Sequence, residues 1–166
     1  MIKLPVNFNI EERRAQATEL FKEGYNCCQA VVLTFADILE DNNLSSKELL
    51  TTIASGFGGG MGRLREVCGA FSGTVMMASF ICPAVDRSDK KTKMENYVLV
   101  QEFAAQFREA NGGSIVCREL LGLPPGVMEK PEPSDRTAQY YQKRPCAEMV
   151  GNAAAIVAQK LIDQTK

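Results

Sequence analysis

The stretch Gly56-Phe-Gly-Gly-Gly-Met-Gly-Arg-Leu-Arg-Glu-Val-Cys-Gly-Ala-Phe-Ser-Gly73 has glycine at five of its first seven positions. A glycine in a helix interior costs about 1 kcal/mol relative to alanine, so an ordinary core helix would not contain so many. We expect a turn that lets the main chain come close to a reactive sulfur site. A helix with a small, tightly packed face at Gly69 and Gly73 should follow it. The stretch points to a cysteine-centred redox or metal-binding protein, and it does not identify a substrate.

Apolar residues at helical spacing predict helices through most of the chain. Val31, Phe35 and Ile38 recur on one helical stripe, and Asn26 suits the N-cap of their helix. Residues 45–48 read Ser-Ser-Lys-Glu, which matches a capping box for the next helix. The predicted helices lie near 10–23, 27–40, 45–55, 67–81, 90–110, 115–121 and 145–163.

The second half of the chain has fewer and longer predicted elements. Ser114 should cap the short helix after it. Residues 123–135 contain four of the seven prolines and should form a surface loop, with Tyr140, Tyr141, Lys143 and Arg144 at its lip. The long helix 90–110 should bury one face, made of Tyr97, Val100, Phe103, Ala104 and Phe107.

No stretch alternates as a strand would. We therefore expect an all-α fold over residues 1–166, a single-domain helical bundle of about six to seven helices with a glycine-rich loop.

Composition excludes several classes of partner. The 166 residues carry a formal net charge of −1, with a pI near 5.6, which does not suit a nucleic-acid or anionic-membrane binder. No apolar run approaches the roughly 18 residues that span a bilayer. The first residues reach charged, helix-like sequence before a signal-peptide core could form, so we expect a cytoplasmic location. The redox partner is not identified, and a homodimer is one open oligomeric state.

Six cysteines and no histidine restrict the chemistry. Structural disulfides are uncommon in a reducing compartment, so metal binding or catalysis is the better explanation for the cysteines. The lack of histidine excludes Cys-His zinc sites, Cys-His nucleophile pairs and Ser-His-Asp triads. No Cys-x-x-Cys is present, so a single site would need cysteines from separate helices.

Four of the cysteines fall at or near predicted helix starts: Cys27, Cys68, Cys117 and Cys146. A helix N-terminus carries partial positive charge and unpaired N–H groups, which favour thiolate and lower a cysteine pKa. We predict that these four converge on one site, and we place Cys28 and Cys82 outside it. The alternative is that most of the six are inert core residues, since free cysteine is commonly buried.

The glycines have two interpretations. Gly58, Gly59, Gly60, Gly69 and Gly73 are candidates for contact with a cofactor, although Gly69 and Gly73 also suit close helix packing. Consecutive N–H groups beside Arg63 and Arg65 could instead form an anion nest. Neither a P-loop nor a Gly-x-Gly-x-x-Gly register is present.

Several motifs resemble the C_GCAxxG_C_C family of redox-active proteins, over about residues 20–160. They are Gly24-Tyr-Asn-Cys27-Cys-Gln-Ala, Gly56-Phe-Gly-Gly-Gly-Met-Gly, Cys68-Gly-Ala-x-x-Gly73, Cys117-Arg-Glu-Leu-Leu-Gly122 and a late Cys146. The resemblance implies a redox role and places the four family cysteines on Cys27, Cys68, Cys117 and Cys146. A more distant similarity to the cysteine-bearing part of split-Soret cytochromes suggests an iron–sulfur centre. Cys28 departs from the family, which more often has a small residue there.

Two functional hypotheses follow. In the first, the four cysteines hold an iron–sulfur cluster or another thiolate-bound metal such as zinc, or act as dithiol–disulfide pairs without a cofactor, as in an oxidoreductase. In the second, the chain is a non-enzymatic helical module that binds metal, senses redox state or binds a partner. Ligand binding at the glycine loop is a third alternative.

Overall fold

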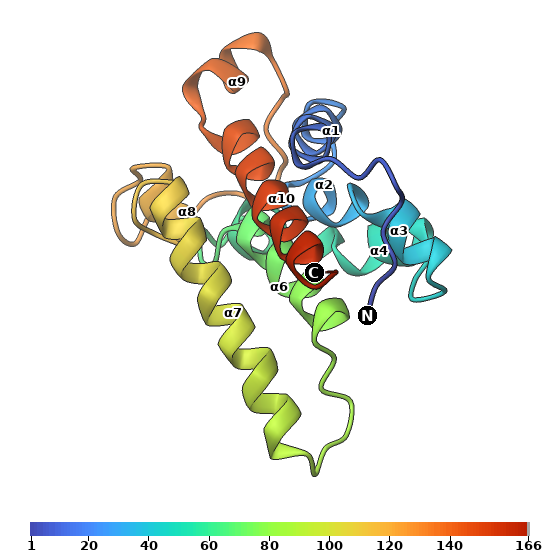
Figure 1. Ribbon diagram of the computed structural model, residues 1–166. Helices are drawn as coiled ribbons and strands as arrows, with labels where there is room; N and C mark the ends of the chain where they lie inside the picture. Colours follow the sequence, from blue (N-terminus) through green and yellow to red (C-terminus); the bar gives the residue numbers. More distant parts are fainter. Residues whose placement is uncertain (166) are drawn as a thin grey trace.

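Helices make up most of residues 1–165, the part of the chain that the computed structural model describes (Figure 1). Among these residues the only β-structure is an isolated antiparallel bridge between Val67 and Val116, which confirms the all-α prediction. None of the described helices is both long and apolar enough to cross a bilayer. In chain order the elements are α1 (Ile10–Lys22), α2 (Cys27–Leu33), α3 (Ala36–Asp41), α4 (Lys47–Ile53), the 3₁₀ turn η1 (Ser55–Phe57), α5 (Gly58–Met61), α6 (Gly69–Ile81), α7 (Lys90–Ala110), α8 (Cys117–Leu120), α9 (Ala138–Lys143) and α10 (Cys146–Asp163).

Polar side chains start several helices, as the sequence suggested. Asn26 caps α2 in a full capping box with Gln29. The predicted box at 45–48 is wrong, because the cap of α4 is Ser46, whose hydroxyl accepts from the N–H of Leu49 at 3.1 Å. Ser114 does not cap α8 either. Its hydroxyl accepts from the N–H of Val116 at 2.9 Å, and the helix begins one residue later.

The single helix predicted over 27–40 is divided into α2 and α3. The Thr34 hydroxyl donates back to the carbonyl of Ala30 at 3.0 Å, a bond that bends helices. The Thr34 carbonyl accepts from the buried guanidinium of Arg13 at 2.6 Å, and the same guanidinium pairs with Asp37. A side chain from α1 therefore takes a carbonyl that a continuous helix would use for itself.

Helix α10 lies at the centre of the molecule, against α1, α2, α6 and α7 (Figure 1). Helices α2 and α6 approach closely, since a Cβ on Gly73 would lie 2.7 Å from the Cβ of Val31. This confirms the predicted small face of α6. On α7 the buried stripe runs through Leu99, Phe103 and Phe107. Tyr97 is 63% exposed, so its predicted place on the buried face is wrong; it lies two residues, about 200° of helical rotation, before Leu99.

Residues 138–143, predicted as the lip of a loop, form helix α9. Thr137 caps it by accepting from the N–H of Tyr140. The Tyr141 ring packs edge-on against Phe21 of α1, with centroids 6.1 Å apart. This packing holds α9 against the end of α1.

Candidate functional site

Each of the four predicted cysteines stands at the start of a helix. Cys27 is the first residue of α2, Cys117 of α8 and Cys146 of α10, while Cys68 immediately precedes α6. The predicted placement is therefore confirmed, within one residue, for all four. The local cause differs from helix to helix: the Asn26 cap fixes α2, and proline at position 145, with its fixed φ, suits the start of α10.

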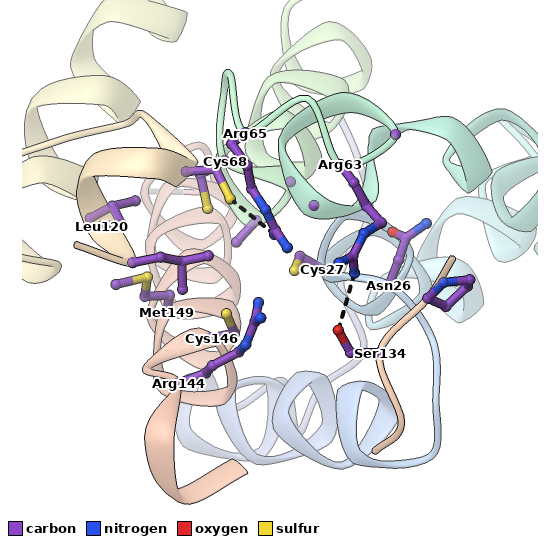
Figure 2. A pocket seen from close by; sticks show the side chains of 18 of the residues that line it. Asn26, Cys27, Arg63, Arg65, Cys68, Leu120, Ser134, Arg144, Cys146 and Met149 are labelled. Carbon is purple, nitrogen blue, oxygen red and sulfur yellow. Dashed lines mark hydrogen bonds between the residues drawn. The ribbon is translucent and has the colours of Figure 1, made fainter. Parts of the chain in front are cut away.

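All four cysteines line one cavity of about 270 Å³. Figure 2 shows the side chains of Cys27, Cys68 and Cys146 directed into it from separate segments. Cys28 and Cys82 do not line it. Cys28 is buried, and its thiol donates to the sulfur of Met76 at 3.5 Å.

Glycines allow the cysteine-bearing segments to meet. A Cβ on Gly69 would lie 3.0 Å from the Cβ of Cys27 and 2.8 Å from the carbonyl oxygen of Phe57. A Cβ on Gly60 would lie 2.7 Å from the Cβ of Cys117, and Gly60 has the left-handed φ of 72° that favours glycine. Main chain thus approaches the thiols where the sequence predicted it. Of the five candidate glycines, Gly58, Gly59 and Gly69 line the cavity, whereas Gly60 and Gly73 serve packing instead.

The isolated bridge places Cys68 beside Cys117. The N–H of Cys68 donates to the carbonyl of Ile115 at 2.8 Å, and the N–H of Cys117 donates to the carbonyl of Glu66 at 2.6 Å. Cys68 is therefore opposite Ile115, two residues from Cys117. In this pairing the two cysteines are diagonal neighbours on the same face of the ladder.

Four arginines line the cavity: Arg63, Arg65, Arg136 and Arg144. Among residues 1–165, no carboxylate side chain lines it. Arg65 lies with one guanidinium nitrogen 3.7 Å from the sulfur of Cys117. Arg136 and Arg144 stand over the ring of Tyr140, at 5.0 and 4.9 Å from its centroid. The sequence did not predict this arginine pair, because Arg144 was expected at the lip of a surface loop and Arg136 carried no motif. The basic and aromatic composition of 136–144 was the only signal available.

The thiols differ in their acidity. The Cys27 thiol donates to the sulfur of Cys146, which lowers the pKa of Cys146 and, together with burial, raises the pKa of Cys27 well above its usual value. Burial raises the pKa of Cys68 to about 12. Burial also raises the pKa of Cys117, although Arg65 opposes the shift. The expectation that a helix start lowers all four pKa values is wrong for three of them, because burial and neighbouring sulfurs outweigh the helix dipole.

A family model described as "Putative redox-active protein (C_GCAxxG_C_C)" matches residues 25–160, which include all four cavity cysteines. The chain belongs to the C_GCAxxG_C_C family. A relative from Archaeoglobus fulgidus, described as an "Uncharacterized protein", is 29% identical over 160 residues, covering 93% of this chain and 96% of the relative. No solved structure matches the chain.

The donor set of this C_GCAxxG_C_C protein can be compared with known sulfur sites. Within residues 1–165, no three His, Cys, Asp or Glu side chains are arranged to hold a single metal ion. One tetrahedral zinc would need its thiolates about 3.8 Å apart, from Zn–S distances of about 2.3 Å. The thiols instead surround a cavity, with arginines among them. Four cysteine thiolates are the usual ligand set of iron–sulfur clusters, so the chemistry of these donors is compatible with such a group.

Proposed function

We propose that the protein transfers electrons through an iron–sulfur cluster held by Cys27, Cys68, Cys117 and Cys146. The observation that carries the proposal is the cavity itself: four thiols from four segments, four arginines and no lining carboxylate among the described residues. A cluster with four thiolate ligands is anionic, and arginines around it offset that charge. When bound, such a cluster would accept and release single electrons.

The protein's own groups would tune this centre. Backbone N–H groups near two of the thiols favour negative charge on sulfur: Gly59 acts to lower the pKa of Cys27, and Ala70 and Phe71 act to lower the pKa of Cys68. Hydrogen bonds to ligand sulfurs withdraw electron density and are one of the levers by which proteins set a reduction potential. Burial of Cys68 and Cys117 would limit the access of water to the centre.

Dithiol–disulfide exchange is the second candidate, and the hydrogen bond from Cys27 to Cys146 favours it. The Cys146 thiolate would attack a substrate disulfide and release one substrate thiolate. Cys27, after losing its proton, would then attack the mixed disulfide, release the second thiolate and form a Cys27–Cys146 disulfide. Two electrons would pass from the protein thiols to the substrate.

One set of preparations separates the two candidates. The protein would be purified without oxygen, and iron, acid-labile sulfide, free thiols and visible absorption would be measured. For a cluster we expect iron and sulfide in equal amounts, with both lost in the Cys27→Ser, Cys68→Ser, Cys117→Ser and Cys146→Ser variants. Cys82→Ser is the matched control, because Cys82 lies outside the cavity and should keep the wild-type content.

The opposite results are equally specific. A metal-free protein that forms a Cys27–Cys146 disulfide on oxidation, detected by peptide mapping, would replace the cluster with dithiol chemistry. A protein without metal after reconstitution with iron and sulfide, and without that disulfide after oxidation, would overturn both candidates.

A further inference from the structure

The proline-rich segment 123–135 covers one side of the cavity instead of projecting from the surface. Pro131, Pro133 and Ser134 line the cavity wall. Arg63 holds this segment in place: its Nε donates to the carbonyl of Lys130 at 2.9 Å, and another guanidinium nitrogen donates to the Ser134 hydroxyl at 3.2 Å (Figure 2). The segment therefore brings its own side chains to the cysteine site.

Glu129 is the acidic side chain that this segment delivers. Its carboxylate is 20% exposed and pairs with both Arg63 and Arg65. The side chain of Arg65 is only 3% exposed, and its guanidinium lies between the Glu129 carboxylate and the sulfur of Cys117. One buried cation is thus shared by a loop carboxylate and a cavity cysteine.

The position of Arg65 is closely determined. Its backbone has a left-handed φ of 61°, which is uncommon for a long side chain. Its N–H donates to the carbonyl of Gly59 at 3.2 Å, and its carbonyl accepts from the N–H of Arg118 at 3.1 Å. These bonds aim the side chain at Cys117, and backbone strain of this kind tends to be retained at functional sites.

We propose that Arg65 and Glu129 form a charge pair that sets the reduction potential of the cysteine site, and that segment 123–135 regulates the site through Glu129. This inference rests on the proposed function in its cluster form, because Arg65 contacts Cys117 and not the Cys27–Cys146 pair. Arg65 is a positioning residue that stabilises negative charge on the Cys117 side. Glu129 offsets part of the charge of Arg65.

The sign of each effect follows from Coulomb's law. Reduction adds negative charge at the site, so a nearby cation favours the reduced form and a nearby anion favours the oxidised form. Burial of the Arg65 guanidinium reduces the screening of these interactions by water and salt. Displacement of the segment would remove Glu129 from the site and make reduction easier. By linkage, reduction would then favour displacement of the segment.

The test compares two uncharged variants, of which Glu129→Gln is isosteric with the wild-type side chain. Arg65→Gln should lower the midpoint potential, whereas Glu129→Gln should raise it. Glu132→Gln is the matched control, because Glu132 is exposed on the same segment and should leave the potential unchanged. Each potential would be measured by redox titration of the reconstituted protein. We expect at least a tenfold change in the reduced-to-oxidised ratio, which is about 59 mV for a one-electron couple.

Further variants separate charge from structure. Arg65→Lys keeps the cation and should remain nearer to the wild-type potential than Arg65→Gln. If Arg65→Gln does not fold, the upward shift in Glu129→Gln still tests the proposal. Hydrogen exchange of 123–135 should be faster in the reduced protein than in the oxidised protein.

Three results would overturn the proposal: shifts of Arg65→Gln and Glu129→Gln in the same direction, a Glu129→Gln potential equal to that of Glu132→Gln, or exchange of 123–135 that does not depend on redox state. The absence of any reversible redox couple would refute the proposed function instead, so the two failures are distinguishable.

Discussion

Replacement of Gly60 by alanine should disrupt the contact between the glycine loop and Cys117. At a φ of 72° an alanine is strained by about 1–2 kcal/mol. Its Cβ would also lie 2.7 Å from the Cβ of Cys117 and 2.7 Å from the backbone nitrogen of Glu66. Backbone cannot move away cheaply, and overpacking of this kind costs about 1–3 kcal/mol. We expect Gly60→Ala to lower the free energy of unfolding by about 2–5 kcal/mol.

The control is Gly62→Ala in the same loop. Gly62 has a similar φ of 56°, but the nearest atom to its added Cβ is the carbonyl oxygen of Gly56, 4.0 Å away. This variant should lose only the conformational part, about 1–2 kcal/mol. Urea unfolding of the metal-free, reduced proteins measures both losses. Equal losses in the two variants would refute the inferred close approach of Gly60 to Cys117.

Three further predictions concern acidity. In metal-free, reduced protein, Cys27→Ala should raise the pKa of Cys146, because the hydrogen bond that stabilises the Cys146 thiolate is lost. The pH profile of alkylation by iodoacetamide would then have a higher midpoint. Cys82→Ser is the control and should leave this midpoint unchanged. Burial raises the pKa values of Cys28 and Cys68 to about 12. Both thiols should therefore resist alkylation at pH 8 in native protein and react in denaturant. Rapid labelling of Cys68 in native protein would contradict its burial. Burial alone would raise the pKa of Asp37, but the hydrogen bonds from Arg13 lower this pKa below 3.8. The Asp37 carboxylate therefore contributes stability above about pH 4, and this stability is lost as the pH falls through the folded-state pKa. Asp37→Asn should be less stable than wild type at pH 7 and should lose less stability on acidification, as measured by thermal unfolding against pH.

Local sequence was sufficient for the helix starts that carry the cysteines. Asn26 and Pro145 act within one turn of Cys27 and Cys146, so their effect can be predicted without a tertiary structure. The glycine density of 56–62 was also interpretable, because glycine is costly unless backbone freedom or close approach requires it.

Long-range contacts account for the errors. The division between α2 and α3 depends on Arg13, which lies 21 residues before the carbonyl it binds. The missed helix α9 depends on the packing of Tyr141 against Phe21 of α1. Neither contact leaves a period in the local sequence, so a periodicity argument cannot detect it.

The sequence by itself determined an all-α chain with four cysteines at helix starts, because propensity, caps and glycine strain act over a few residues. Only the tertiary structure decided that these starts meet at one cavity, that Arg136 and Arg144 join it, and that segment 123–135 carries Glu129 to Arg65. It also decided the acidity of each thiol. Burial and neighbouring charges act through space, so three thiols at helix starts have raised pKa values and one has a lowered value.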